Sequence, residues 1–313
     1  MISVIIPTYR RYEMLKEAVR SVLAQTYQDI EIIVVDDCSN DETPKICDFS
    51  SKIIYLRNEE NCGPGYSRRR GLLYSKGEYI VFLDDDDYYI SKTFFADALE
   101  KLSSNDDYVF VASPAQVLLQ STGSYSDCPL NVKGEIGAVE YLSGFSSRFD
   151  VPLTFATIFS RKHLDVCGVF EMKMVNHMPM IMRSLQSGNV FFLDKPVGVY
   201  RQHANNISNK IATSFLIDNL TEKLELFSII KGNRLFPNYN NWWLEQVKTT
   251  VGYFVYGSHP NLLKLKKIKR WCIANSEEKH IIKALFTQYR DYLIDYRVCL
   301  LKSKVKKVLG VRE

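Results

Sequence analysis

The sequence lacks the features of an exported, membrane-spanning or zinc-binding protein. No run of 18 apolar residues occurs in its 313 residues, and Met1 leads straight into an apolar segment without a basic region or a cleavage site. The seven cysteines are scattered without any CxxC pair, which argues against a zinc site and favours a reduced interior. We therefore expect a cytoplasmic protein.

A strong charge of one sign is also missing. The chain has 40 basic and 36 acidic residues, a net charge of +4, so nothing in this balance indicates a nucleic-acid partner. Hydrophobic residues make up 46% of the chain, which is enough to bury one large core or two moderate ones.

Short apolar runs alternate with helical patterns in the first half of the chain. This alternation predicts an α/β fold with a mostly parallel sheet, because the crossover helices must lie on the faces of the sheet. The segments expected as strands are Ser3–Pro7, Glu31–Val35, Lys52–Leu56, Glu78–Leu83, Tyr108–Ser113, Thr154–Ser160, Asn189–Leu193 and Val197–Tyr200. The segments expected as helices are Tyr12–Gln25, Gly65–Ser75, Lys92–Leu102 and Met178–Gln186.

Polar residues follow the first four predicted strands. Ligands of such sheets bind beyond the carboxyl ends of the strands, so these residues should crowd one edge. The clusters are Pro7-Thr8-Tyr9, Asp36 to Ser39, Arg57-Asn58 and Asp84 to Asp87. Thr8 and the two aspartates of the second cluster are also typical turn formers, although an acid at that strand end could accept a hydrogen bond from a uracil imide.

Four consecutive carboxylates, Asp84 to Asp87, end the fourth predicted strand. Two carboxylates about 4 Å apart repel by roughly 1 kcal/mol in bulk water and by roughly 4 kcal/mol at the effective dielectric of a protein surface. The cluster therefore indicates a bound cation, with a solvated acidic turn as the alternative.

The segment Asn61–Gly71 predicts a turn that opens a basic helix. Gly63 and Gly65 permit close backbone approach. The three successive arginines point about 100° apart around a helix, so they cannot all face one cleft. We expect Arg68 to donate charge-assisted hydrogen bonds to a diphosphate and the other two arginines to lie on a solvated face.

Four segments together resemble the inverting family-2 glycosyltransferases, which have a GT-A type nucleotide-sugar fold. They are SVIIPTYRR, SVLAQTYQDIEIIVVDDCSND, NCGPGYSRRRG and SKGEYIVFLDDDDYY, in the family's order and spacing over roughly residues 1–90. Weaker similarity continues to about residue 209. The resemblance implies that a nucleotide sugar is bound by Pro7, Thr8, Tyr9, Asp37, Arg68, Asp84, Asp85 and His203. Asp37 would contact the base, Arg68 the diphosphate, and Asp84 and Asp85 the ribose.

The same resemblance implies a divalent metal, Mn²⁺ or Mg²⁺. Asp86 would be its direct ligand, and Asp87 either a second ligand or a cap of the next helix. Tyr200–Ser208 is similar to a segment near the end of the family's catalytic domain, which would bring His203 to the metal or the diphosphate. Asn206 departs from the serine that is more usual there.

The general base departs further from the family's pattern. Where the family has Glu-Asp before a helix, this chain has Asn176 and His177, aligned through Pro179 and Arg183. His177 is our expected base, since a neutral imidazole can accept a proton from an acceptor hydroxyl. Glu171 could supply the base instead, or the protein could bind a donor sugar without transferring it.

The composition becomes helical beyond about residue 210. The clearest helical patterns are Phe215–Ile230, Trp242–Tyr256 and Ile281–Leu301, and basic and apolar residues interleave at Leu262–Trp271 and Lys302–Lys307. Such stretches can bind an anionic membrane surface, or they can form a solvated helix face over a buried apolar stripe.

These observations predict a catalytic domain at residues 1–209, with a nucleotide-sugar half at 1–113 and an acceptor half at 114–209, followed by a helical region at 210–313. The expected protein is a metal-dependent inverting glycosyltransferase of hexosyl or N-acetylhexosaminyl type. It would use a UDP-sugar as donor and a lipid-linked glycan as acceptor. The product would be a bacterial surface polysaccharide, and the enzyme would act in the cytoplasm at the inner face of the plasma membrane. The alternative is a nucleotide-sugar-binding protein with weak or lost activity. A phosphotransferase fits less well, because no partner lysine and threonine loops are apparent.

Overall fold

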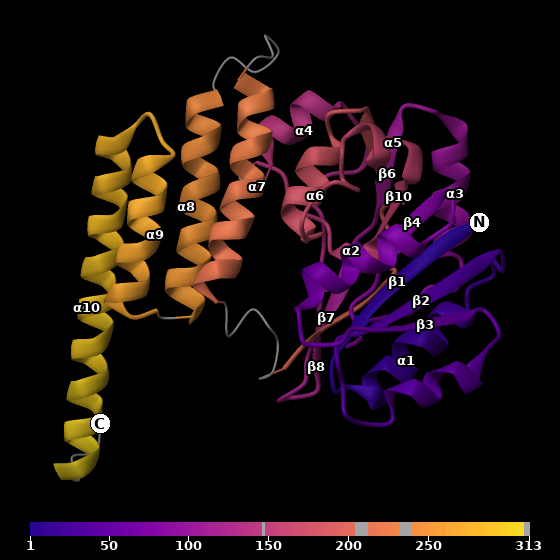
Figure 1. The fold of residues 1–313 in the computed structure, drawn as a ribbon, viewed down its shortest axis with the longest axis horizontal. Coiled ribbons are helices and arrows are strands. Elements are labelled where there is room, and N and C mark those ends of the chain that lie inside the picture. The colour runs from indigo at the N-terminus through magenta and orange to yellow at the C-terminus, as the bar shows by residue number, and fades with distance from the viewer. Residues whose placement is uncertain (146–147, 204–211, 232–238, 259, 310–313) are drawn as a thin grey trace. The chain divides into compact units, whose positions relative to one another are not determined.

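The computed structural model describes residues 1–145, 148–203, 212–231, 239–258 and 260–309 (Figure 1). The chain divides into two compact units, Met1–His203 and Ala204–Glu313. The expected boundary at residue 209 and the unusual Asn206 lie outside the described residues. The predicted domain ranges, including the division at residue 113, therefore stay predictions.

An eight-stranded sheet forms the centre of the first unit, in the order β3-β2-β1-β4-β10-β6-β11-β9. The strands are β1 Ile2–Thr8, β2 Ile30–Asp36, β3 Ile53–Arg57, β4 Tyr79–Phe82, β6 Tyr108–Ala112, β9 Gly134–Ile136, β10 Thr157–Ser160 and β11 Asn189–Phe192. Strands β1 to β4 pair in parallel, as do β6 and β11, whereas β10 runs antiparallel to both of its neighbours. The predicted mostly parallel sheet is confirmed.

A second sheet, which the sequence did not predict, has the order β5-β12-β7-β8. Its strands are β5 Tyr88–Tyr89, β7 Ala115–Leu119, β8 Ser124–Cys128 and β12 Gly198–Gln202. The expectation that Val197–Tyr200 completes the main sheet was wrong, because β12 pairs with β5 and β7 instead. The predicted strand Thr154–Ser160 begins as a 3-10 turn, η2 Thr154–Ala156, and only then continues as β10.

Helices cover both faces of the main sheet. They are α1 Tyr12–Leu23, η1 Thr43–Phe49, α2 Pro64–Tyr74, α3 Phe94–Ser104, α4 Ala138–Gly144, α5 Arg161–Val166 and α6 His177–Ser184. Every residue of β1 and β2 is buried, as expected for a sheet that is covered twice. Helix α2 lies very close to the sheet, because a Cβ on Gly71 would come within 2.4 Å of Ile5 Cγ2.

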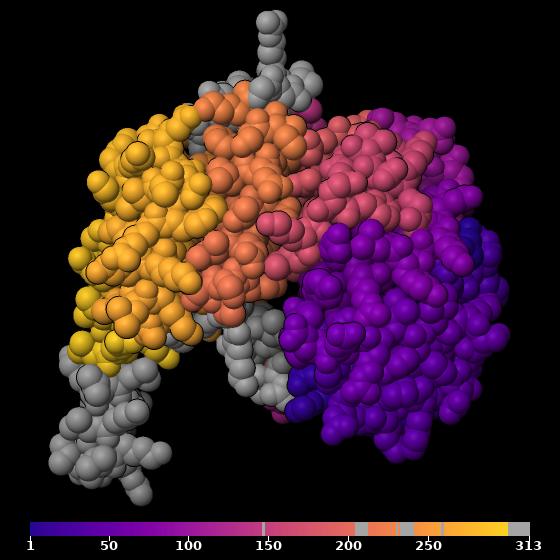
Figure 2. Space-filling view, in the orientation of Figure 1, coloured from indigo at the N-terminus to yellow at the C-terminus, as the bar shows by residue number. Residues whose placement is uncertain are grey.

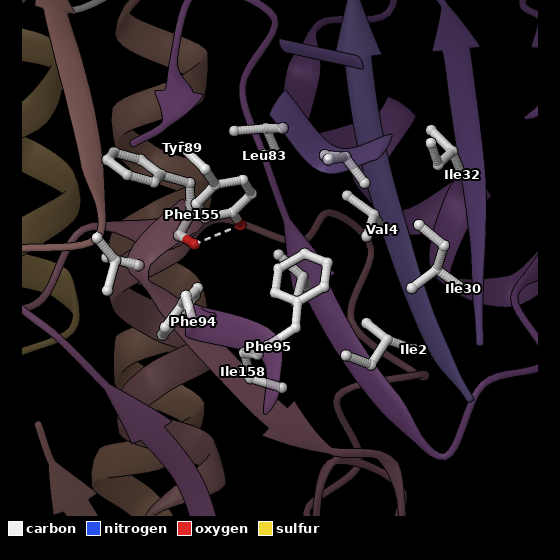
Figure 3. Packing of buried hydrophobic residues seen from close by; sticks show 14 of the residues in the cluster. Ile2, Val4, Ile30, Ile32, Leu83, Tyr89, Phe94, Phe95, Phe155 and Ile158 are labelled. Carbon is white, nitrogen blue, oxygen red and sulfur yellow. Dashed lines mark hydrogen bonds between the residues drawn. The ribbon is translucent and has the colours of Figure 1, made fainter. Parts of the chain in front are cut away.

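Alternate residues of the strands build the core under α1 and α3. Figure 3 shows Val4 and Ile32 of neighbouring strands and Phe95 of α3 in one cluster of buried side chains. Tyr89 packs edge-on against Phe95 and donates a hydrogen bond to the Phe155 carbonyl at 2.7 Å (Figure 3). The space-filling view shows the N-terminal half as a continuous indigo-to-purple surface (Figure 2). This core fixes β5 and therefore the acidic loop that precedes it.

The second unit consists of helices in the part that the structure describes. They are α7 Thr213–Lys231, α8 Tyr239–Ser258, α9 Leu262–Ala274 and α10 Lys279–Leu309, in agreement with the predicted helical region. Trp243 anchors its core: its ring packs at a tilt against Phe227, and its Nε1–H donates to Ser276 Oγ at 2.8 Å. No described helix is long and apolar enough to cross a membrane.

Candidate functional site

The polar clusters of the first four strands meet at one edge of the main sheet, as predicted. The backbone N–H of Asp37 donates to the Thr8 carbonyl, and that of Asn58 to the Asp36 carbonyl, both at 2.8 Å. Thr8 Oγ1 donates to Asp85 Oδ2 at 2.8 Å. Loops that are up to 77 residues apart in the sequence therefore form one polar surface.

The first cluster surrounds Thr8. Pro7 is buried within β1, and Tyr9 is 37% exposed. The Tyr9 backbone N–H points to Asp85 Oδ2 at 3.4 Å. Pro7 is thus a structural part of the strand, whereas the Tyr9 ring is accessible to a ligand.

Asp37 is buried and fully engaged as an acceptor. Its Oδ1 accepts from Asn58 Nδ2 at 2.7 Å and from the Cys62 backbone N–H at 2.9 Å, and its Oδ2 accepts from the Gly63 N–H at 2.7 Å. The carboxylate therefore holds the loop that precedes α2 against the end of β2. A contact with a base stays a prediction for Asp37.

The acidic loop contains the most perturbed carboxyls of the unit. Asp85, Asp86 and Asp87 are each no more than 5% exposed, whereas the Asp84 side chain is about one-third exposed. Burial raises the pKa of Asp85 to about 7, against the lowering effect of the Arg11 guanidinium. Burial, followed by the charge of Asp86, raises the pKa of Asp87 well above its usual range. A concentration of buried carboxyls at a strand end is typical of a functional site.

Asp87 has a structural contact that the sequence did not predict. Its Oδ1 accepts the backbone N–H of Arg201 in β12 at 3.1 Å, and α3 begins only at Phe94. Asp87 therefore ties the acidic loop to the second sheet and does not cap the following helix.

Arg68 lies on α2 and faces the acidic loop. Its Nη2 forms an ion pair with Asp84 Oδ1, while its buried Nε has no partner among the described residues. The expectation that Arg69 and Arg70 are solvated was wrong. Arg69 Nε donates to the Met172 carbonyl at 2.7 Å, and Arg70 Nη1 donates to the Arg57 carbonyl at 2.6 Å, so both help to anchor the helix.

His177 begins α6 on the side of Arg68 and Asp84. Burial, together with the positive charge of Arg68, lowers the pKa of His177 to about 4, with Asp84 and a hydrogen bond to Pro152 acting the opposite way. The buried Nε2 of His177 has no hydrogen-bond partner among the described residues. Glu171 is exposed and lies beside Gly168, where a Cβ would come within 3.2 Å of Glu171 Oε2.

Asp86 and His203 form the pair to which a metal could bind. His203 Nε2 lies 3.0 Å from Asp86 Oδ2. The two groups are hydrogen-bonded, and a carboxylate and a neutral imidazole can both be ligands of a divalent ion, so an ion bound there would replace this hydrogen bond. Within the described ranges no group of three or more His, Cys, Asp or Glu side chains could hold an ion alone. An ion at this pair would therefore need further ligands, such as phosphate oxygens and water.

Sequence reasoning missed two residues of this site, Arg11 and Arg201. Arg11 donates to Asp85 at 2.9 Å and to Asp86 at 2.7 Å. Arg201 of β12 donates to Glu17 of α1 at 2.7 Å and lies over the Tyr88 ring. The doubled arginine after Tyr9 was the only sequence signal for Arg11, and the tyrosine-arginine pair of the segment near residue 200 was the signal for Arg201.

Comparison with known proteins identifies similar chains. Residues 3–125 match the family model described as Glycosyl transferase family 2. The chain is 28% identical over 210 residues to the GalNAc(5)-diNAcBac-PP-undecaprenol beta-1,3-glucosyltransferase of Campylobacter jejuni, covering 64% of each protein. It is 40% identical over 93 residues to the UDP-Glc:alpha-D-GlcNAc-diphosphoundecaprenol beta-1,3-glucosyltransferase WfaP of Escherichia coli, covering 29% of this chain and 37% of that protein.

The chain spans between 18% and 64% of the length of the curated relatives that it matches. Among solved structures, S. aureus TarS 1–349 in complex with UDP-GlcNAc is similar, with a TM-score of 0.71 and 18% identity over 95% of this chain and 91% of that one. The fold is thus of the GT-A type, followed by a helical region.

Proposed function

This chain belongs to glycosyl transferase family 2 through residues 3–125, and from that premise we propose that it transfers a sugar from a UDP-sugar to a glycan acceptor carried on a lipid diphosphate. The product would be a bacterial surface polysaccharide. Two relatives whose names specify transfer to undecaprenyl diphosphate-linked glycans support this acceptor class. The UDP-GlcNAc bound by a structural neighbour supports the donor class.

One observation gives the strongest support for the proposal. Two buried polar atoms without partners among the described residues, Arg68 Nε and His177 Nε2, belong to neighbouring side chains beside the acidic loop. A buried unpaired polar atom costs about 1–3 kcal/mol, and a substrate would relieve this cost. A phosphate oxygen could accept from Arg68 Nε, and an acceptor hydroxyl could donate to His177 Nε2.

The proposed reaction is a single displacement. His177 Nε2 takes the proton of the acceptor hydroxyl, whose oxygen forms a bond to the anomeric carbon while the bond to the UDP oxygen breaks. The sugar therefore inverts its configuration. Arg68 stabilises the departing diphosphate, and a divalent ion held by Asp86 and His203 would neutralise further charge there.

The test measures UDP release from UDP-glucose and UDP-GlcNAc by the purified protein with Mn²⁺. Asp86→Ala and His177→Ala should each lower the release at least 100-fold. Asp106→Ala and His280→Ala are the matched controls, since their side chains are 99% and 79% exposed, and they should retain wild-type rates. Equal rates in all four variants would refute the proposed roles.

A binding function is the second candidate, and the absence of the family's carboxylate at His177 favours it. A nucleotide-sugar-binding protein would bind UDP-sugars without releasing UDP, even when an acceptor is present. Calorimetry with UDP-GlcNAc alongside the release assay separates the two functions, because tight binding with no turnover fits only the binding protein.

The location proposed for the enzyme is the inner face of the plasma membrane, with α9 as the contact element. Exposed Lys264, Lys266, Lys267 and Arg270 lie on α9 with Leu263, which is 78% exposed. Such a combination of cations and an apolar side chain suits an anionic lipid surface. The side chains of Lys302–Lys307, the second basic stretch, lie outside the described residues.

A further inference from the structure

Arg11 places a positive charge inside the acidic loop. Its Nη1 donates to Asp85 Oδ1 at 2.9 Å and to Asp86 Oδ2 at 2.7 Å. The Arg11 side chain is 21% exposed, and the two carboxylates are 5% and 7% exposed. Because these groups are screened little by water, the guanidinium interacts strongly with both acids.

The same Asp86 oxygen also receives His203. Arg11 Nη1 and His203 Nε2 lie 2.7 and 3.0 Å from Asp86 Oδ2. A divalent ion bound by Asp86 and His203 would therefore lie beside the Arg11 guanidinium. The two cations would share one carboxylate and repel each other.

We propose that Arg11 is a positioning residue that serves as the resident counter-cation of the acidic loop. It holds Asp85 and Asp86 in place before the donor arrives, and it competes with the divalent ion for Asp86. The inference rests on the metal-binding role of Asp86 and His203 in the proposed function. Its consequence is a metal affinity that the protein itself keeps low until the diphosphate adds negative charge.

The expected size of the effect follows from Coulomb's law. A single and a double positive charge about 5 Å apart repel enough, even at the dielectric of bulk water, to change an affinity on the order of tenfold. The less polar surroundings of the loop would enlarge this factor. Removing the charge of Arg11 should therefore tighten metal binding at least tenfold.

The test is a titration of Mn²⁺ without any substrate, with free Mn²⁺ followed by electron paramagnetic resonance. Arg11→Gln should lower the dissociation constant at least tenfold. Arg10→Gln is the matched control, because Arg10 is exposed and its guanidinium lies over the Tyr9 ring at 4.9 Å. Its dissociation constant should stay within twofold of the wild type. A folded Arg11→Gln variant with unchanged or weaker Mn²⁺ binding would overturn the proposal.

Thermal unfolding supplies a second readout. In EDTA, Arg11→Gln should melt at a lower temperature than the wild type, because its carboxylates lack a counter-cation, and Mn²⁺ should raise its melting temperature more than that of the wild type. If Arg11→Gln does not fold, Arg11→Met replaces it, since methionine keeps a long side chain and removes the charge. Its Mn²⁺ affinity should likewise exceed that of the wild type at least tenfold, and unchanged affinity would refute the role.

The outcomes separate this inference from the proposed function. Mn²⁺ binding that is equal in the wild type and the folded Arg11 variants refutes only the role of Arg11. If the wild type and Arg11→Gln bind UDP but neither binds Mn²⁺, even with UDP present, both the role of Arg11 and the metal dependence fail, while nucleotide binding survives.

Discussion

In the proposed function, His177 is the base at the position where the resembling family has a carboxylate, and its basicity is similar. An ordinary aspartate has a pKa of about 3.9, and burial with the charge of Arg68 lowers the pKa of His177 to about 4. The expected base therefore has about the same proton affinity as a carboxylate, but the site has one negative charge fewer beside Arg68. When a diphosphate binds near Arg68, its negative charge should raise the pKa of His177 and make it a stronger base.

The first prediction concerns His177. His177→Ala should lower the transfer rate by about 10² to 10⁴, the usual contribution of a general base, while the dissociation constant for UDP stays within about threefold. His177→Asp should recover part of the rate, because a carboxylate has the required basicity. Stopped assays with radiolabelled donor measure both variants.

The pH dependence gives an independent check on His177. Its free-enzyme pKa is lowered to about 4, so the neutral, active form predominates above that value. His177 should therefore contribute no titration near pH 6.5 to the kcat/KM of the wild type. A step near pH 7, the raised pKa of Asp85, should persist in His177→Ala, whereas the fall toward pH 4 should be absent from that variant. A full rate in His177→Ala, together with a loss in Glu171→Gln, would assign the base to Glu171 instead.

Individual site residues were predictable where a contiguous motif contained them. Asp84 to Asp87 and Arg68 stand in recognisable strings, and the structure brings them together. Arg11 was not predictable, because its role depends on contacts with residues 74 and 75 positions away. The shifted pKa of His177 was equally hidden, since it comes from burial, which only the tertiary structure defines.

At the scale of elements, α2 determines where His177 lies. The Val175 N–H donates to the Gly65 carbonyl at 2.9 Å, and Arg69 holds the Met172 carbonyl. A Cβ at Gly65 would lie 2.6 Å from Asn176 Oδ1 and 3.2 Å from Met174 Cβ. Any residue larger than glycine at position 65 would therefore displace the segment that leads into α6.

The second prediction follows from this contact. Gly65→Ala should destabilise the protein by about 1–3 kcal/mol through overpacking, and it should lower transfer while UDP binding is kept. Gly257→Ala is the control, because a Cβ there meets nothing within 4 Å. In helix α8 that change should be stabilising by about 0.5–1 kcal/mol. Chemical denaturation of both variants measures the difference, and equal stabilities would contradict the packing argument.

The third prediction concerns Lys223, a buried cation of α7. Lys223 is 2% exposed, and its Nζ donates to Thr250 Oγ1 at 2.7 Å and to Gln246 Oε1 at 3.1 Å on α8. Burial lowers the pKa of Lys223 to about 7, below the unfolded value of about 10.4. Between these values the unfolded chain binds the extra proton, so stability should rise with pH.

The slope of this rise should approach about 1.4 kcal/mol per pH unit between about pH 7 and 10. Lys223→Met should remove it, whatever its effect on stability at pH 7. Urea unfolding at a series of pH values compares the variant with the wild type. A slope that is the same in both proteins would show that Lys223 is not buried as a neutral amine.

Predictability at the element scale followed burial. Strands β1, β2, β4 and β6 were visible because they are largely buried and apolar. The hairpin β7–β8 was not, since all but the last of the β8 residues are exposed and most are polar. Strand β12 pairs with β7 of that hairpin, so the second sheet, to which β12 belongs, could not be predicted either.

At the scale of the whole molecule, the order of motifs predicted the GT-A fold and the helical region that follows it. The sequence left two alternatives for the basic stretches of these helices: they bind a membrane surface, or they form a solvated helix face. The structure gives α9 a buried stripe, Leu265, Ile268 and Cys272, and leaves Lys264, Lys266, Lys267 and Arg270 exposed. This arrangement is compatible with both alternatives, and lipid binding is the property that distinguishes them.

The fourth prediction is that α9 binds anionic vesicles. Each cation near such a surface contributes about 1 kcal/mol, so changing Lys266 and Lys267 together to glutamine should weaken binding about 30-fold. The control changes Lys279 and Lys283 of α10, which are also exposed, and it should leave the affinity within about threefold. Co-sedimentation with phosphatidylglycerol vesicles measures both, and the loss should shrink as salt screens the charges. If the full chain binds no vesicles, or if both pairs weaken binding equally, α9 is a solvated helix and its charges serve no membrane contact.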